Sequence, residues 1–217
     1  MEENKKYELV EDDFIIHKGK KLYRIRALKG ISSVICYIPE GFKGGYVEGY
    51  HNLSQEDNCW IFNDSKVYGN AVVSKCSAII YNSEVYGNAR VIDSVVKYDS
   101  EVYGNAIVKN NSEINNYSKV FGNAVIVNSS IIKNTYISYN SSVISKGGII
   151  LNDSSMSGNS TVTISAGAGA EFRRLIATNN SKMEILREEN TVIPDRSVVI
   201  HNLTREKNEI YRLIKEV

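Results

Sequence analysis

The sequence predicts an all-β solenoid, and three observations carry that prediction. Four near copies of one heptapeptide begin at Ser65, Ser83, Ser100 and Ser118, which lie 18, 17 and 18 residues apart. Within this period an aliphatic residue recurs about every six residues. A small residue stands two positions before each aliphatic one. A fixed repeat of this kind indicates a stack of similar structural units.

Two columns of residues define the inside of the predicted solenoid. A strand places residues i and i+2 on one face, whereas no α-helix gives a strict period of six with inward residues two apart. The aliphatic column is Val67, Val73, Ile79, Val85, Val91, Val96, Val102, Val108, Ile114, Val120, Ile126, Ile132, Ile137, Val143, Ile149, Met156 and Val162. The small column is Ser65, Ala71, Ser77, Ser83, Ala89, Ser94, Ser100, Ala106, Ser112, Ser118, Ala124, Ser130, Thr135, Ser141, Gly147, Ser154 and Ser160. We therefore expect three short strands per turn and about six turns over residues 59–170.

Glycine and asparagine mark one corner of the predicted turns. Gly-Asn pairs occur at 69–70, 87–88, 104–105, 122–123 and 158–159. Glycine takes the positive φ that a tight corner requires, and asparagine suits such corners as well. No proline lies between Pro39 and Pro194, as an uninterrupted ladder of backbone hydrogen bonds demands.

Different segments flank the turns. Residues 14–17 and 22–26 are typical of a hairpin, and residues 34–38 indicate a second strand pair. We expect residues 1–58 to form an N-terminal β cap, because an uncovered solenoid end exposes apolar surface and unpaired backbone. Residues 171–217 form the third predicted segment. It comprises an irregular turn or strand extension and then a short C-terminal helix from Thr204 to Val217.

The repeat unit resembles that of a known family. Val67-Tyr-Gly-Asn-Ala-Val72 is similar to the hexapeptide repeat of left-handed parallel β-helix proteins. Most members are trimeric acyltransferases, and some are γ-class carbonic anhydrases. The Val-Tyr-Gly-Asn-Ala form resembles a narrower group of uncharacterised bacterial, phage and prophage proteins, sometimes labelled transferases. The resemblance covers residues 20–165, and it implies a left-handed parallel β-helix and a homotrimer.

Charge and composition exclude several classes of protein. The net charge is +1, and basic and acidic residues balance in each of the three segments, which disfavours nucleic acid as a partner. The N-terminal residues lack an apolar stretch, and no run approaches the roughly 18 apolar residues of a membrane span. Cys36, Cys59 and Cys76 are odd in number and lack metal-ligand spacing. We expect them to be reduced and buried in a cytoplasmic protein.

Histidine bears most directly on enzyme function. The chain has only His17, His51 and His201, none of them between residues 59 and 170. The γ-class carbonic anhydrases need three histidines in their turns around a zinc ion, so we expect no metal site. Acyltransferases of the family use coenzyme A, with a histidine as general base. His51, just before the first turn, is the one candidate for that role, although no extruded loop is expected to hold a substrate.

An aromatic column is the other candidate site. Tyr68, Tyr86, Tyr103 and Phe121 each follow an inward aliphatic residue and so point outward, one per turn, followed by Ser138 and Ser157. Such a column either stacks on itself or forms a trimer interface, or it binds an external partner or ligand. The adjoining residues Lys66, Glu84, Glu101 and Lys119 predict a solvated ladder of charges.

Two functions follow from these observations. The first is a non-catalytic binding or scaffold protein of phage or prophage type, which presents a rigid prism to a host protein or to a small ligand such as a nucleotide. Counter-defence is the setting that the resemblance suggests, and no cofactor is expected. The alternative is an acyltransferase that uses coenzyme A with His51 as its base.

Overall fold

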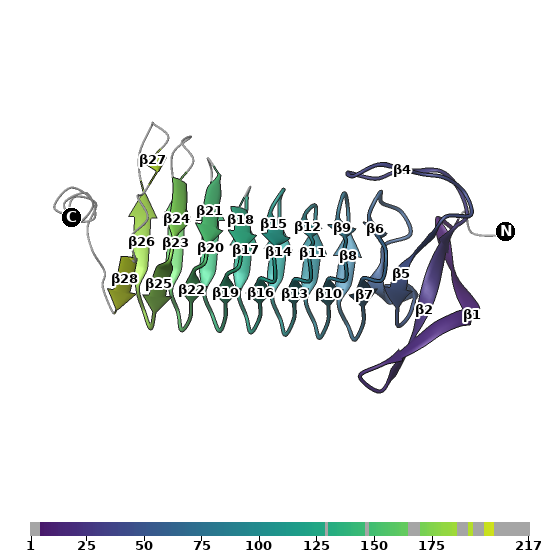
Figure 1. Ribbon diagram of the computed structural model, residues 1–217, viewed down its shortest axis with the longest axis horizontal. Coiled ribbons are helices and arrows are strands. Elements are labelled where there is room, and N and C mark those ends of the chain that lie inside the picture. The colour runs from purple at the N-terminus through teal and green to yellow at the C-terminus, as the bar shows by residue number, and fades with distance from the viewer. Residues whose placement is uncertain are drawn as a thin grey trace.

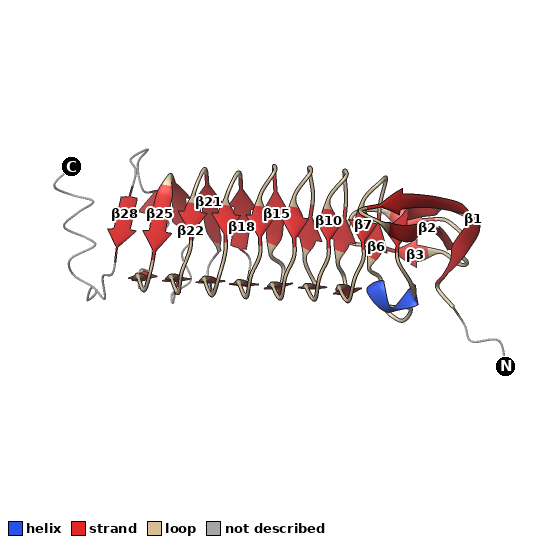
Figure 2. Cartoon of the chain, turned by 90° about the horizontal axis from the view of Figure 1, so that it is seen from below, coloured by secondary structure: helices blue, strands red, loops and turns tan. Residues whose placement is uncertain are grey.

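The computed structural model describes residues 5–128, 130–145, 148–164, 170–185, 191–192 and 198–201. These residues form an all-β parallel solenoid of about seven turns, which confirms the predicted class (Figure 1). An antiparallel β cap covers the N-terminal end of the rod. The turns lie one behind the other along the axis, and the short 3-10 turn η1 (Tyr50–Asn52) lies beside the cap (Figure 2).

Three sheets form the sides of the rod, here called faces 1, 2 and 3 in the order in which residues 66–79 pass through them. Face 1 is an 11-stranded sheet of β1(Tyr7–His17), β2(Lys20–Ala27), β5(Lys43–Val47), β7(Lys66–Val67), β10(Glu84–Val85), β13(Glu101–Val102), β16(Lys119–Val120), β19(Tyr136–Ile137), β22(Ser155–Met156), β25(Leu175–Thr178) and β28(Val198–His201). Face 2 is a 7-stranded sheet of β8(Val72–Ser74), β11(Arg90–Ile92), β14(Ile107–Lys109), β17(Val125–Val127), β20(Ser142–Ser145), β23(Thr161–Ile164) and β26(Lys182–Ile185).

Face 3 is an 8-stranded sheet of β6(Trp60–Ile61), β9(Ala78–Ile79), β12(Val95–Val96), β15(Glu113–Asn115), β18(Ser130–Lys133), β21(Ile149–Asn152), β24(Ala170–Arg173) and β27(Thr191–Val192). A separate two-stranded ribbon, β3(Ile31–Ser32) with β4(Tyr37–Ile38), extends from the cap.

Equivalent residues of successive turns lie in register. On face 1, Val67 pairs with Val85, and Val85 pairs with Val102. The backbone N–H of Glu84 donates to the Ser100 carbonyl at 2.9 Å, as the N–H of Glu101 does to the Ser118 carbonyl. This ladder brings residues that are 17 to 23 positions apart in the sequence side by side, so that each repeated residue becomes a column along the rod.

The aliphatic column forms the core as predicted, and so do the small residues other than Ser130 and Gly147, whose burial lies outside the description; at β21, however, Leu151 and not Ile149 pairs with the inward Ile132. Every member of the aliphatic column is buried, and Leu151 and Phe172 join them on face 3. The buried serines also satisfy backbone groups. Ser83 Oγ donates to the Ile80 carbonyl at 2.9 Å and accepts from the Ser100 N–H at 3.3 Å. Serine is therefore both small enough for the corner and able to pair backbone groups that have no strand partner there.

The Gly-Asn corner forms two columns of its own. Gly69, Gly87, Gly104, Gly122 and Gly158 all have φ between 69° and 74°. A Cβ on Gly104 would lie 3.0 Å from the backbone N and O of Gly122, so a side chain there would press closely on the next turn. Beside them runs a chain of amide hydrogen bonds at 2.8–3.1 Å, which links Asn70, Asn88, Asn105, Asn123, Asn140, Asn159 and Asn180.

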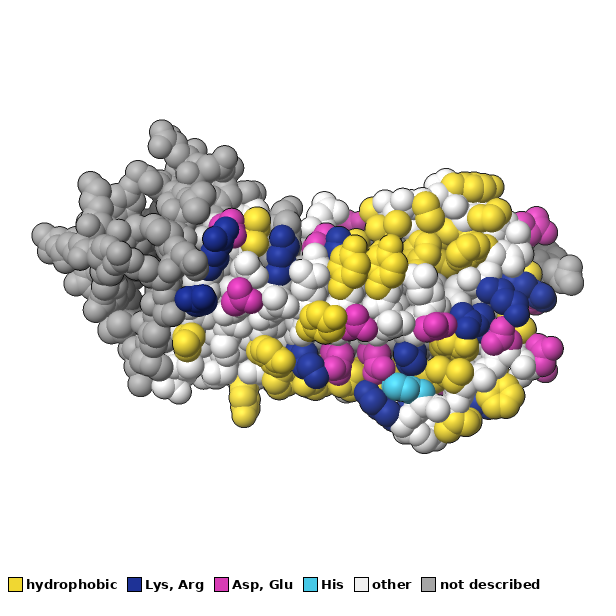
Figure 3. All heavy atoms as spheres, viewed as in Figure 1, with side chains coloured by type: hydrophobic (Ala, Val, Ile, Leu, Met, Phe, Trp, Pro, Cys, Tyr) yellow, Lys and Arg dark blue, Asp and Glu magenta, His cyan; other side chains and the backbone are white. Residues whose placement is uncertain are grey.

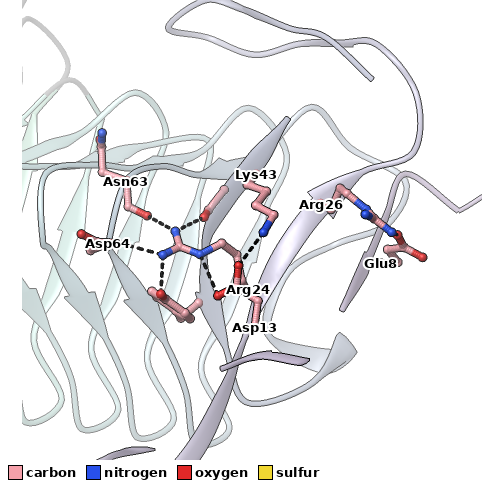
Figure 4. Close-up of polar contacts among 9 residues, drawn as sticks. Glu8, Asp13, Arg24, Arg26, Lys43, Asn63 and Asp64 are labelled. Carbon is pink, nitrogen blue, oxygen red and sulfur yellow. Dashed lines mark hydrogen bonds and ion pairs between the residues drawn. The ribbon is translucent and has the colours of Figure 1, made fainter. Parts of the chain in front are cut away.

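The cap is joined to the first turn by backbone and by Arg24. Strand β5 pairs antiparallel with β2 and parallel with β7, which continues face 1 from the cap into the turns. The guanidinium of Arg24 donates to the Gly44 carbonyl at 2.9 Å and to Asp64 at 3.2 Å, and it lies 3.4 Å from Asp13 (Figure 4). It also bonds the Tyr46 hydroxyl. Arg24 thus connects three segments of chain that are distant in sequence.

Several predictions need correction. The solenoid has about seven turns instead of six, because β24 to β28 continue the ladder beyond residue 170. Cys36 and Cys76 are exposed, and only Cys59 is buried; Cys36 lies in the loop between β3 and β4, and Cys76 in a turn ahead of the inward Ser77. Because of that loop, residues 34–36 are not in the strand expected over 34–38.

Other predictions stay open. The predicted helix from Thr204 to Val217 lies outside the described residues. The division into segments 1–58, 59–170 and 171–217 stays a prediction. In the part of the chain that the structure describes, no helix is long and apolar enough to cross a membrane.

The glycine column provides a test of how closely the turns approach. Gly104→Ala should lower the free energy of unfolding by about 1–3 kcal/mol, because a Cβ adds both positive-φ strain and a backbone clash. Gly41→Ala is the matched control, since Gly41 has φ +81° but nothing within 4 Å of an added Cβ. Urea unfolding followed by circular dichroism measures both. An equal decrease in the free energy of unfolding of the two variants would show that the close approach of the turns adds nothing to the effect of the substitution.

Candidate functional site

The four aromatic residues of face 1 form one continuous stack. Ring centroids are 5.0 Å apart between Tyr68 and Tyr86, 4.8 Å between Tyr86 and Tyr103, and 4.9 Å between Tyr103 and Phe121. The ring planes differ by no more than 2°. The register of face 1 imposes this arrangement, because each ring follows the inward residue of its turn. The predicted self-stacking is therefore present, and a binding role for these rings stays a prediction.

The stack is less exposed than a free aromatic surface would be. Tyr68 is only 4% exposed, and Tyr86, Tyr103 and Phe121 are half-buried. The hydroxyl of Tyr68 donates to Glu84 at 2.9 Å, and that of Tyr86 donates to Glu101 at 2.9 Å. Burial, and then these hydrogen bonds to carboxylates, raise the pKa of both tyrosine hydroxyls well above the usual range. These two tyrosines therefore act as neutral hydrogen-bond donors.

The tip of the β1–β2 hairpin covers the Tyr68 end of the stack. The His17 ring packs edge-on against Tyr68 with 5.4 Å between centroids. Lys18 Nζ lies 2.9 Å from Glu84 and 4.7 Å from the centre of the Tyr86 ring. His17 Nε2 is 3.0 Å from the other oxygen of Glu84. Figure 3 shows basic, acidic and histidine side chains gathered beside the turns next to the cap.

The charge column beside the rings is part of this network: opposite charges of neighbouring turns pair along it, as Lys66 does with Glu84, but Lys66 and Glu84 are more buried than a solvated ladder implies. The side chain of Glu84 is 15% exposed, accepts hydrogen bonds from Lys18 and Tyr68, and lies within ion-pair distance of His17 and Lys66. Burial by itself would raise the pKa of Glu84, but hydrogen bonds from Lys18 and Tyr68 and the nearby His17 outweigh it and hold the pKa below its usual value. Further along, Lys119 Nζ pairs with Glu101 at 2.6 Å.

His51 lies away from the aromatic stack. It belongs to the 3-10 turn η1, beside the glycine corner of the first turn, and its side chain is exposed. Its Nε2 is 2.7 Å from the Gly69 carbonyl, and so Nε2 is the protonated nitrogen, which leaves Nδ1 as the acceptor. Nδ1 faces Gly49, where it would lie 2.9 Å from an added Cβ. The nitrogen that a general base would use therefore lies beside Gly49 of the same chain.

Sequence reasoning missed a second group of aromatic residues. At the corner between faces 3 and 1, Tyr81 and Tyr98 stack with centroids 4.8 Å apart, and both have positive φ. Tyr117 follows one turn later at 64% exposure. The signal is present in the sequence, since Tyr81 and Tyr98 each lie two residues after an inward aliphatic residue. Tyr117 lies three residues after Ile114, however, and this offset hides the column from a strict periodic search.

Face 2 carries a set of outward aliphatic residues that sequence reasoning also missed. Alternation along each strand turns both neighbours of the inward residue toward solvent. On face 2 many of these neighbours are apolar and partly exposed: Val72, Ile92, Ile107, Val125, Val127 and Ile144. Ile107 and Val125 are adjacent on neighbouring turns, and so are Val127 and Ile144.

Comparison with known proteins does not identify a family for the chain. No protein-family model matches it, and no curated protein matches it. Among the described residues, no group of three or more His, Cys, Asp or Glu side chains is placed to hold a metal ion. The resemblance to hexapeptide-repeat and phage proteins therefore contributes expectations alone.

Acid should weaken the contact between the hairpin and the stack. Because the pKa of Glu84 is lower in the folded chain than the ordinary 4.5, its network stabilises the fold above that pH and is lost as pH falls through the folded-state pKa. Glu84→Gln should lower the urea midpoint at neutral pH and flatten its decline below about pH 4.5. Glu113→Gln, on a face 3 carboxylate paired with Lys97, is the control. Identical pH profiles for wild type and Glu84→Gln would contradict the network.

Proposed function

We propose that this chain is a non-catalytic binding protein, a rigid scaffold that presents face 1 of its solenoid to a protein or small ligand. The observation that carries the proposal is the aromatic stack. Four parallel rings are held at 4.8–5.0 Å spacing by the ladder, by carboxylates and by the hairpin tip. A ladder core needs only aliphatic and small residues, so a fixed outward row of rings is available for recognition.

Rigidity supports a binding role. Association costs free energy when side chains must be ordered, and that cost is smaller when the contacting groups are already fixed. Tyr86 and Tyr103 are fixed by stacking on both ring faces, and Tyr86 also by its bond to Glu101. Aromatic residues of this kind are enriched where proteins recognise partners.

The biological setting rests on the resemblance of the repeats. We infer a cytoplasmic protein of phage or prophage type that acts in counter-defence, by blocking a host protein or by sequestering a nucleotide. This inference is associational, because one fold hosts many functions.

The acyltransferase alternative has less support from the geometry. A general base must reach the proton that it removes, with an acceptor nitrogen directed at the substrate. The Nε2 of His51 is occupied by the Gly69 carbonyl, and Nδ1 faces Gly49. Acetyl-coenzyme A therefore tests the acyltransferase alternative, and the proposed binding function does not require it as a ligand.

We further propose that the chain assembles as a homotrimer through face 2. Ile107 and Val125, which are partly exposed and adjacent on neighbouring turns, would lie in that contact. Face 1 is less suited to this role, because the cap hairpin already crosses one end of its stack. Apolar residues that are regularly spaced on a flat face are typical of contacts between copies of a chain.

The binding function is tested by what the protein carries when it is purified gently from its own host. Native mass spectrometry should show a ligand or partner on the wild type that is lost in the double variant Tyr86→Ser and Tyr103→Ser. The double variant Tyr81→Ser and Tyr98→Ser, on the corner column, should retain it. Far-UV circular dichroism checks that both variants are folded.

Two results would contradict the binding function. One is a partner that stays bound after the face 1 rings are removed. The other is transfer of an acetyl group from acetyl-coenzyme A that is lost in His51→Gln, which would establish the acyltransferase.

The assembly proposal has a separate test. The wild type should have the mass of three chains, and Ile107→Lys with Val125→Lys should dissociate it, because burying two charges costs more than the contact provides. Val34→Lys with Ile35→Lys, on the exposed β3–β4 loop, should leave the trimer intact. A wild-type monomer at micromolar concentration, or a trimer that survives the face 2 substitutions, would contradict it.

A further inference from the structure

A lysine is buried against a cysteine where the cap meets the first turn. Lys6 is 2% exposed, and Cys59 is 0% exposed. Lys6 Nζ lies 3.4 Å from Cys59 Sγ, and it donates to the carbonyls of Asp57 at 2.6 Å and of Cys59 at 3.0 Å. Lysine is almost never fully buried unless it is paired with an opposite charge. Among the described residues no carboxylate forms an ion pair with Lys6, and the Cys59 thiol is the ionisable group that its amine contacts.

Hydrogen bonds around Lys6 hold the amine in this position. Gln55 Oε1 accepts from the N–H of Lys6 at 2.8 Å and from the N–H of Tyr7 at 3.2 Å, and Gln55 Nε2 donates to the Tyr7 carbonyl at 3.1 Å. The Tyr7 hydroxyl donates to the Leu53 carbonyl at 2.9 Å. These bonds attach the start of β1 to the loop that precedes Cys59. The amine and the thiol are therefore held together before any reaction, and such a fixed pair reacts far faster than two free groups.

Burial favours the neutral form of both groups. It lowers the pKa of the Lys6 amine and raises the pKa of the Cys59 thiol, although each partner opposes the shift of the other. A neutral amine is a nucleophile, and it also accepts a proton from a thiol that it contacts. The thiolate, which is the form of cysteine that reacts with oxidants, therefore has a proton acceptor beside it at 3.4 Å.

Exposed chain flanks the buried pair on both sides. The segment before Cys59 consists of bends, and Glu56 and Asn58 in it are exposed. Lys5, at the N-terminal end of the described chain, is exposed as well. Chain ends and loops of this kind open locally far more often than the whole fold unfolds. Local opening there gives a small oxidant such as hydrogen peroxide a route to the thiol.

We propose that Lys6 and Cys59 form a modification site, at which oxidation by peroxide joins Nζ to Sγ as a sulfenamide. Hydrogen peroxide takes two electrons from the thiol, which becomes a sulfenic acid, and one water is released. The amine then attacks the sulfur, the S–N bond forms, and the sulfenic oxygen leaves with two protons as a second water. Over both steps the protein loses two hydrogen atoms. The new bond fastens the cap to the first turn, and this inference goes beyond the proposed binding function without depending on it.

The test uses the full-length chain with Cys36→Ser and Cys76→Ser, in which Cys59 is the one remaining thiol and no intramolecular disulfide forms. After treatment with hydrogen peroxide and cleavage at acidic residues, mass spectrometry should show the peptides of Lys6 and Cys59 joined, two hydrogen atoms lighter than their sum. The thermal midpoint should rise by about 5 °C, because the link closes a long loop of the unfolded chain. Dithiothreitol should reverse both changes, since a thiol attacks the sulfur and releases the amine.

Lys6→Arg in the same background is the matched control. Arginine keeps a positive charge and N–H donors but offers no neutral amine, so Cys59 should gain oxygen without a link and the thermal midpoint should not rise. The proposal is overturned if Cys59 gains only oxygen while Lys6 stays free, or if Cys59 joins a different lysine. It is also overturned if Cys59 stays unmodified at the peroxide concentration that oxidises the exposed Cys36 and Cys76 of the wild type. The mapping of the link in the first protein decides the matter even if the control variant does not fold.

Discussion

The hydrogen bond from each strand to the strand one turn later is the interaction on which the rest of the structure depends. It fixes equivalent residues of successive repeats side by side, so that every position of the repeat becomes a column. What each column contributes depends on the type of side chain that it repeats. Valines and isoleucines close the core, serines pair backbone groups at the corners, and glycines allow the turns to approach. Outward amides and aromatic rings are brought to the spacing at which they bond or stack.

The cap turns one of these columns into an organised site. The β1–β2 hairpin crosses from the cap onto the second turn, where Lys18 and His17 meet Glu84. Glu84 in turn accepts from Tyr68, so the first ring is fixed by contacts from both the solenoid and the cap. Toward Phe121 these contacts are fewer: Tyr86 still donates to Glu101, but the turn after Tyr103 carries Lys119 in place of a glutamate. The cap thus covers the stack at its Tyr68 end, and this asymmetry gives face 1 a direction that the repeat alone does not have.

Much of this architecture is readable from the sequence, because the repeat is local and the ladder follows from it. The inward columns, the glycine corner and the self-stacking of Tyr68, Tyr86, Tyr103 and Phe121 all follow from spacing. What spacing misses are the contacts between distant segments. Lys18 and Glu84 are 66 residues apart, and nothing periodic connects them, so a solvated charge column is what the sequence predicts. The extra turn escapes prediction because the inward residues Val143, Leu151 and Phe172 no longer keep a six-residue step.

Hydrogen exchange on the strand amides of face 1 tests the central claim most directly. If the in-register ladder holds the rings, the N–H groups of Tyr86 and Tyr103 should exchange far more slowly than those of the corner residues Asn70 and Lys75. The first two donate across the ladder at 3.0 and 2.9 Å, whereas Lys75 donates to a side chain. Strong and similar protection of Tyr86 and Tyr103 is the predicted result. Exchange as rapid as at the corners would show that the turns are not held in this register, and the stacked column would lose its basis.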